Sequence, residues 1–195
     1  MNMVDYDKTY AEFKSDVPEF FNFAGDVLDK WAQNPNKLAL WWIDDDGNEA
    51  KRTFAQLCRR SRQLCNVLAG QGVKKGDVVI VVLPRLIEWW EINIACLRLG
   101  AVISPGTTQL TPKDMKYRFD SAEAVCVITD ADNAPKVDEV RDQCPTVKSF
   151  ILVGSSKDGW VNYEEAVASA SDQYETVITR SDENAILYFT SGTTG

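Results

Sequence analysis

Between residues 77 and 154 the sequence alternates short β-branched runs with segments of helical periodicity, and this alternation restricts the possible folds more than any other feature. The β-branched runs are DVVIVVL, AVISPG, AVCVITD and SFILVG. The helical segments between them are IEWWEINIACLRLG, Pro112 to about Ser121, and Val137 to Gln143. Short, continuously apolar runs are typical of parallel strands covered on both faces. The sequence therefore predicts an α/β fold, a mostly parallel sheet with helices on both faces.

Ahead of this region the sequence predicts a helix, an antiparallel hairpin and a long helix. The first helix ends before Asn34-Pro35, and its apolar residues lie at helical spacing: Phe23, Val27, Leu28 and Trp31. Asp46-Gly47 suits a tight turn between strands ending near residue 44 and covering residues 49–53. The acidic triplet 44–46 suggests metal at first sight, but beside a glycine it is better explained as a solvated turn. Thr53 is a candidate N-cap for the long helix, which ends at Gly70 to Gly72.

The net charge argues against a nucleic-acid-binding surface. Lys and Arg number 21 against 29 Asp and Glu, a net charge of −8, and no strong basic stripe is present. His is absent, which excludes a Ser-His-Asp triad and most zinc sites from this stretch. An anionic ligand would have to be held locally, by backbone amides.

No targeting or membrane segment is visible in the sequence. The first 20 residues are acidic and lack arginine, unlike a transit peptide, and apolar runs such as residues 78–83 are too short to span a bilayer. We expect a soluble intracellular protein, either cytoplasmic or, for an animal source whose presequence has been removed, in the mitochondrial matrix. The cysteines are odd in number and lie mostly in apolar segments, which predicts reduced core thiols: Cys58, Cys65, Cys96, Cys126 and Cys144.

The sequence ends in YFTSGTTG, a loop of hydroxyls and glycines behind an apolar run. Residues 185–189 favour β structure and are predicted to form a buried strand. The glycines that follow permit positive φ and close backbone approach, so the loop could hold a polyphosphate. It lacks the lysine of the P-loop pattern, and composition alone leaves a surface turn equally open. The position behind a strand favours phosphate.

Two further loops follow predicted strands at the same sheet edge, where ligands of open parallel sheets bind. SPGTTQL is explained by composition as a structural turn. LPRLIEWWEI could supply an aromatic acyl site with Arg85 as carboxylate partner. Helical spacing instead predicts that at least one of Trp89 and Trp90 packs against the sheet, and that Arg85 braces its loop.

YFTSGTTG resembles the nucleotide-phosphate loop of the AMP-forming acyl-CoA synthetases, within the adenylate-forming enzyme superfamily. Upstream stretches are similar to the medium-chain branch of that family, so that the resemblance runs from about Pro18 to Gly195: PEFFNFAGDVLDKWA, LALWW, VVLPRLIEWWEI, CLRLGAVISPGTTQL and DGWVNYEEA. In the family, a proline and a lysine follow this loop. Those positions would lie after Gly195 and are not part of this sequence.

The resemblance implies a medium-chain fatty acid:CoA ligase that uses ATP, Mg²⁺ and coenzyme A, with the fatty acid, ATP and CoA as its small-molecule partners and a homo-oligomer left open. It implies a CoA contact for Gln109 and assigns the phosphates of ATP to the terminal loop: Thr190, Ser191, Gly192, Thr193, Thr194 and Gly195. Residues 1–195 would form the N-terminal part of the large AMP-binding domain. The small C-terminal domain, the adenine and magnesium motifs and the catalytic lysine would lie beyond Gly195, so we expect no catalytic or metal-binding residue within the chain.

Two alternatives remain open. A non-catalytic fragment or pseudoenzyme could act as a binding or dimerisation module, and we expect these 195 residues by themselves to be inactive. A ligase for acetate, benzoate or another carboxylate is the other alternative, because the family's acid pocket is built largely from residues outside this sequence.

Overall fold

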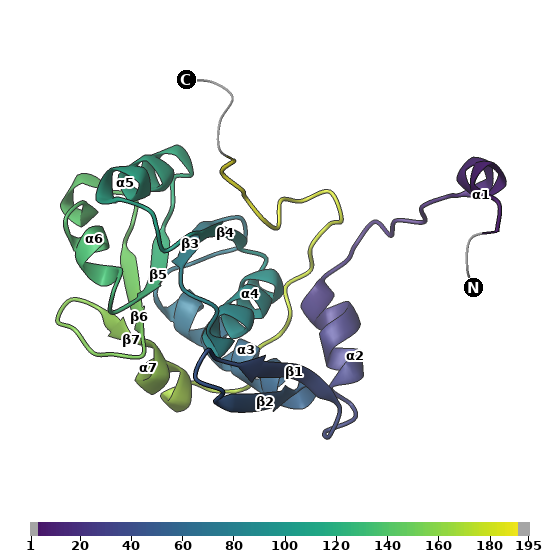
Figure 1. Cartoon of the computed structure of the whole chain (residues 1–195), viewed down its shortest axis with the longest axis horizontal. Helices are drawn as coiled ribbons and strands as arrows, with labels where there is room; N and C mark the ends of the chain where they lie inside the picture. The colour runs from purple at the N-terminus through teal and green to yellow at the C-terminus, as the bar shows by residue number, and fades with distance from the viewer. Residues whose placement is uncertain (1–3, 191–195) are drawn as a thin grey trace.

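The computed structural model describes residues 4–190, which form a parallel sheet with helices on both faces and a separate hairpin (Figure 1). The sheet has five strands in the order β4-β3-β5-β6-β7, all parallel. Its strands are β3 (Val78–Val82), β4 (Val102–Gly106), β5 (Cys126–Asp130), β6 (Ser149–Val153) and β7 (Val161–Asn162). The hairpin pairs β1 (Leu38–Ile43) with β2 (Glu49–Thr53) in antiparallel fashion. The predicted fold class is confirmed, and the short β7 is a strand that the sequence did not predict.

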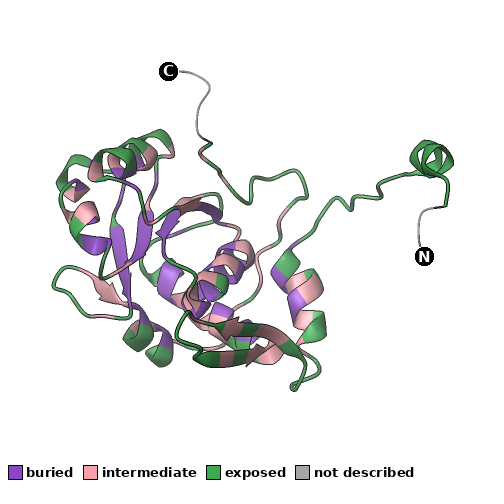
Figure 2. Cartoon of the chain, in the orientation of Figure 1, coloured by how far each residue is buried: buried purple, intermediate pink, exposed green. Residues whose placement is uncertain are grey.

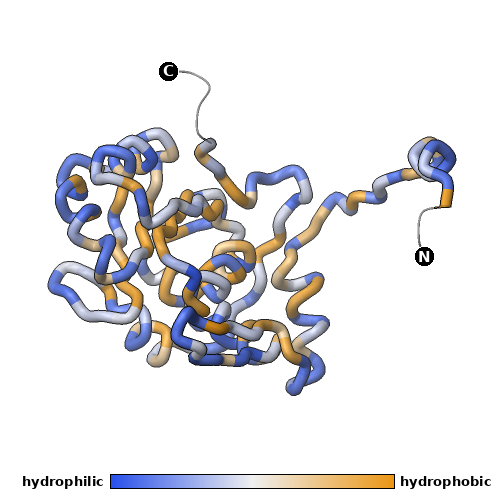
Figure 3. Tube along the Cα trace, in the orientation of Figure 1, coloured by the Kyte–Doolittle hydropathy of each residue, from blue (hydrophilic) through white to orange (hydrophobic). Residues whose placement is uncertain are grey.

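Alternate strand residues pack against different helices, as the period of two along a strand requires. Val79 and Val81 belong to the cluster under one set of helices, and Ile80 and Val82 to the cluster on the opposite face. The first set is α3 (Phe54–Gly70), α4 (Ile87–Leu99) and α7 (Tyr163–Ser169); the second is α5 (Pro112–Ser121) and α6 (Ala134–Asp138). Strands β3 to β6 are accordingly buried along most of their length (Figure 2), and apolar stretches run through the middle of the molecule (Figure 3).

Local signals place the ends of the long helices where the sequence predicts them. Thr53 and Thr111 begin α3 and α5 with capping boxes: each side chain accepts from the amide three residues on, and that residue's side chain bonds back. Gly100 ends α4 in the left-handed conformation, with φ +74°, which a Cβ would disfavour.

Two helical predictions need correction, and one further helix was not predicted. The N-terminal helix consists of a π-helical turn, η1 (Ala24–Leu28), followed by α2 (Asp29–Trp31). The segment predicted as one helix at residues 137–143 is split into α6 and the 3-10 turn η2 (Arg141–Gln143); α6 begins earlier than predicted, with Pro135 in its first turn, where proline is tolerated. A short helix, α1 (Tyr6–Glu12), has no buried residue and lies away from the sheet (Figure 1).

All five cysteines are buried free thiols, as predicted. Within residues 4–190, no helix has both the length and the apolar character needed to cross a membrane.

Candidate functional site

The carboxyl end of the parallel sheet carries the loops that the sequence singled out. Ile103 in β4 pairs in parallel with Ile186. The Ile103 amide donates to the Ala185 carbonyl over 3.1 Å, and the Leu187 amide donates to the Ile103 carbonyl over 2.9 Å. The two segments run in the same direction. Thr107 lies four residues after Ile103 and Thr190 four residues after Ile186, so both threonines lie at the same edge of the sheet. The structure thus brings the SPGTTQL loop and the entrance to the terminal loop together.

Residues 185–189 do not form the buried strand that the sequence predicts. They are extended and touch the sheet through one isolated bridge to β4. Ile186 is 43% exposed and Tyr188 66% exposed. Residues 185–189 are mostly apolar, but they lie at the edge of the sheet, where a neighbouring strand can hydrogen-bond from one side only.

Phe189 fixes the last part of this segment against α5. Its ring meets Tyr117 edge to face at 6.0 Å between centroids, and the Arg118 guanidinium lies 4.8 Å from the ring centre. Thr190 is exposed at the end of this contact. The other residues assigned to ATP phosphate, 191–195, lie outside the described residues.

The loop that carries Gln109 is held from two sides. A Cβ on Gly106 would lie 2.8 Å from Leu110 Cδ1 and 3.1 Å from Val82 Cγ2, so this close approach requires glycine. Lys136 Nζ donates to the Thr108 carbonyl over 2.8 Å and to Asn133 Oδ1 over 2.9 Å. Gln109 itself is exposed. Sequence reasoning missed Lys136 and Asn133, although TDADNAPK follows a strand and was open to the same argument.

A groove lies between the hairpin and α4 at this edge. It encloses about 700 Å³. Trp42 Nε1 donates to the Arg85 carbonyl over 2.6 Å, so the loop is braced through the Arg85 backbone rather than through its exposed side chain. Trp89 packs at the rim of the core, as predicted, whereas Trp90 is 46% exposed. Arg85 and Thr107 line the groove together with the four tryptophans of LALWW and LPRLIEWWEI, which are Trp41, Trp42, Trp89 and Trp90.

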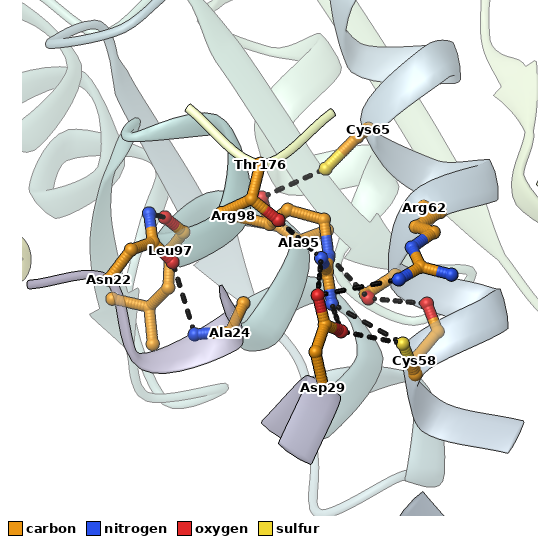
Figure 4. Close-up of polar contacts among 11 residues, drawn as sticks. Asn22, Ala24, Asp29, Cys58, Arg62, Cys65, Ala95, Leu97, Arg98 and Thr176 are labelled. Atoms are coloured by element: carbon orange, nitrogen blue, oxygen red, sulfur yellow. Dashed lines mark hydrogen bonds and ion pairs between the residues drawn. The ribbon is translucent and has the colours of Figure 1, made fainter. Parts of the chain in front are cut away.

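A buried ion pair holds the opposite end of α4, and the sequence analysis missed it (Figure 4). The Arg98 side chain is 0% exposed and donates to Asp29 over 2.7 and 3.0 Å, and to Ser61 Oγ over 3.1 Å. Burial alone would raise the pKa of Asp29, but the hydrogen bonds from Arg98 and Cys58 hold it below its ordinary value of 3.8. Both charges are therefore retained. Arg98 lies in CLRLG and Asp29 in the N-terminal helix, 69 positions apart, and no local pattern pairs them.

The chain matches known proteins along its whole length. The model of the AMP-binding enzyme family matches residues 28–195. The chain is 44% identical over 202 residues to the Mus musculus acyl-coenzyme A synthetase ACSM3, mitochondrial, a match that covers 100% of this chain and 35% of that protein. It is 46% identical over 187 residues to acyl-coenzyme A synthetase ACSM5, mitochondrial, of Mus musculus, covering 92% of this chain and 32% of that protein.

Two solved structures share the fold. The acyl-CoA synthetase of Brucella canis has a TM-score of 0.87 and 28% identity, over 97% of this chain and 36% of that one. The anthranilate CoA ligase AuaEII, in complex with anthranoyl-AMP, has a TM-score of 0.84 and 25% identity, over 94% of this chain and 35% of that one.

The chain spans about a third of the length of these relatives. The resemblance that the terminal motif predicted is confirmed: the chain belongs to the AMP-binding enzyme family, and its relatives in that family are acyl-CoA synthetases.

Proposed function

We propose that the protein carrying this chain is an AMP-forming medium-chain fatty acid:CoA ligase. The observation that carries the proposal is the 44% identity, over the whole chain, to a protein named as an acyl-coenzyme A synthetase. The placement of two loops supports it, because the SPGTTQL loop and the entrance to YFTSGTTG lie at the edge where open parallel sheets bind ligands.

The proposed reaction has two steps. A carboxylate oxygen attacks the α-phosphorus of ATP; an O–P bond forms as the bond to pyrophosphate breaks. The thiolate sulfur of CoA then attacks the acyl carbonyl, and AMP leaves with the bridging oxygen. In this scheme Thr190 and residues 191–195 hold the departing pyrophosphate through hydroxyls and amides, which stabilises charge as it develops. Gln109, on the neighbouring loop, contacts CoA.

Mg²⁺ would offset the charge of the phosphates in such a reaction. Residues 4–190 contain no group of three or more Asp, Glu, Cys or His side chains placed to hold a metal ion. The roles proposed for this chain concern phosphate and CoA contacts.

A panel of carboxylic acids in a pyrophosphate-release assay tests the substrate class in the complete protein. We expect release with acids of about six to twelve carbons. An aromatic-acid ligase is the second candidate, because AuaEII is described with anthranoyl-AMP. Release with benzoate or acetate but not with the medium-chain acids would overturn the chain-length proposal. The relatives are named as mitochondrial proteins, which supports a mitochondrial location for this protein, and fractionation of the source cells tests it.

The phosphate role of the terminal loop is tested by Thr193→Ala and Thr194→Ala in the complete protein. A lost hydrogen bond to a charged group is worth about 1.5–3 kcal/mol, so adenylation should fall roughly ten- to a hundredfold. Unfolding midpoints should remain at the parental value. Parental adenylation kinetics in both variants would support the surface-turn alternative.

A further inference from the structure

The segment that leads into the terminal loop has no regular structure of its own. This entry segment, residues 171–187, contains no helix or strand and makes two isolated bridges, at Arg180 and Ile186. Its path is therefore determined by contacts with the rest of the chain. Any residue that holds this path also determines where Thr190 is presented.

Asn22 ties the entry segment to the end of α4. The residue is 8% exposed, and its Nδ2 donates to the Leu97 carbonyl over 2.8 Å and to the Val177 carbonyl over 3.0 Å. Its Oδ1 accepts from the Ala24 amide over 3.1 Å (Figure 4). Both amide protons of one short side chain thus join three segments, and a carboxylate or a hydroxyl cannot reproduce the two donors.

Arg98 holds the neighbouring position. Its Nη1 donates to Thr176 Oγ1 over 2.5 Å, and its carbonyl accepts from the Val177 amide over 3.0 Å. The Asn22 side chain therefore holds Val177, and the Arg98 side chain holds the neighbouring Thr176 (Figure 4). Because Arg98 also neutralises Asp29, altering Arg98 would leave that carboxylate without its partner, whereas altering Asn22 leaves the Arg98–Asp29 pair in place.

Beyond this point the N-terminal residues 18–22 run antiparallel to the entry segment. The Phe21 amide donates to the Thr179 carbonyl over 3.0 Å, and Thr179 Oγ1 donates to the Phe21 carbonyl over 2.6 Å. The Ser181 amide donates to the Glu19 carbonyl over 3.0 Å. The contacts of Ala185 and Leu187 with Ile103 follow, so successive hydrogen bonds hold the entry segment at several points between Asn22 and β4.

We propose that Asn22 is a positioning residue for nucleotide binding: it fixes Val177 against α4, and thereby aligns the entry segment with β4 and sets where Thr190 is presented. The link to ATP rests on the proposed function. The link between Asn22 and the path of the segment rests on the contacts alone.

Hydrogen exchange on the 195-residue chain tests whether Asn22 holds the path of the entry segment. Asn22→Asp keeps the size of the side chain and places a carboxylate against two carbonyl oxygens. We expect the amides of Phe21, Val177, Ser181 and Leu187 to exchange at least about tenfold faster, with the amides of β3 and β5 unchanged.

The matched control is Asn66→Asp. Asn66 Nδ2 donates to the Ser171 and Gln173 carbonyls over 2.8 and 3.0 Å, which makes the same kind of contact earlier in the same segment. This variant should leave the four reporter amides at parental rates. If Asn22→Asp leaves them unchanged, or accelerates the strand amides equally, Asn22 has no positioning role.

Thr179→Val provides a milder second variant if Asn22→Asp does not fold. It removes the hydroxyl bond to Phe21 and should accelerate the Phe21, Ser181 and Leu187 amides in the same selective way; no change in them overturns the proposed path.

In the complete protein, Asn22→Asp should raise the KM for ATP severalfold and leave the KM for the fatty acid unchanged. A purely structural defect would lower active enzyme without separating these constants, so equal effects on both would overturn the nucleotide role. The exchange experiment does not depend on enzymatic activity. It therefore tests whether Asn22 holds the entry segment even if the proposed function is wrong.

Discussion

Arg98 has a fully buried guanidinium on the face of α4 that meets α3, and its charge must be balanced inside the protein. Asp29 accepts two of its hydrogen bonds, and Ser61 and Thr176 accept one each. Burial alone would lower the pKa of Arg98, but the bonded Asp29 carboxylate raises it above its ordinary value. Removing one partner from such a pair leaves a charge without compensation, which costs far more than the pair contributes.

We therefore expect Asp29→Ala to lower the free energy of unfolding by about 3 kcal/mol, at the lower end of the range for buried pairs because the Asp29 side chain is 27% exposed. Denaturant titration measures this. Asp182→Ala is the matched control: its partner Arg180 is 46% exposed, and surface pairs contribute little to stability. Equal losses of unfolding free energy in Asp29→Ala and Asp182→Ala would contradict the expectation that burial makes the loss of Asp29 costly.

The same carboxylate predicts a dependence on pH. Because the pKa of Asp29 is lower in the folded protein than its ordinary value of 3.8, the unfolded state takes up a proton first as the pH falls. The stability that Asp29 contributes is complete above that value and is lost as the pH falls through the folded pKa. We expect the difference in unfolding free energy between the parent and Asp29→Asn to be constant between about pH 5 and 7 and to narrow below about pH 4. A constant difference down to the acid limit of folding would contradict the lowered pKa.

At the scale of elements, two glycines at helix ends differ in whether the structure requires a glycine there. Gly100 ends α4 with φ +74°, and a Cβ there would lie 3.0 Å from Lys75 Cγ and 3.1 Å from Thr179 Cγ2. Gly70 is the last residue of α3, and no atom lies within 4 Å of the position of its Cβ. The first glycine is required by backbone and packing; the second is not.

Gly100→Ala and Gly70→Ala should therefore shift stability in opposite directions. A left-handed alanine costs about 1–2 kcal/mol, and contact with Thr179 adds to this. Alanine at a compatible helical position stabilises by about 0.4–1 kcal/mol, because the unfolded chain loses entropy. Thermal unfolding midpoints of the two variants provide the measurement, and shifts of the same sign would contradict the assignment of Gly100 as the required cap.

On the scale of the whole molecule, every cysteine of the chain is buried: Cys65, Cys96, Cys126 and Cys144 lie in the two clusters that cover the faces of the sheet, and Cys58 lies in a third cluster between α3 and the N-terminal helical turns. Burial raises the pKa of Cys58 to about 11, helped by Asp29, and raises the pKa of Cys65 and of Cys126 to about 12. A thiol reacts as its thiolate, so these groups are protected by protonation as well as by packing.

We expect the native chain to show no fast-reacting thiol at about pH 8, and all five cysteines to react once the chain is unfolded. Titration with a chromogenic disulfide, with and without denaturant, gives both counts. The ratio also tests whether the chain folds with the core described above. Rapid labelling of Cys65 or Cys126 in the native protein, located by mass spectrometry, would contradict that core.

The sequence by itself determined the elements and the family. The alternation from residue 77 to residue 154 predicted four strands of the sheet, because periodicity depends on neighbours in the chain. Thr53, Thr111 and Gly100 marked helix ends for the same local reason. YFTSGTTG carried the resemblance that the comparisons confirmed, and the positions of residues 191–195 and the contacts of Gln109 with CoA stay predictions.

Only the tertiary structure decided the order of the strands, the edge position of residues 185–189, the groove of four tryptophans, and the pairing of Arg98 with Asp29. The contact between Asn22 and Val177 joins residues 155 positions apart. Nothing in the surroundings of either residue in the sequence specifies the other, because the contact depends on where the tertiary packing places α4 and the entry segment. Local chemistry determines which face of an element is apolar, whereas the closure of long loops determines which polar groups meet.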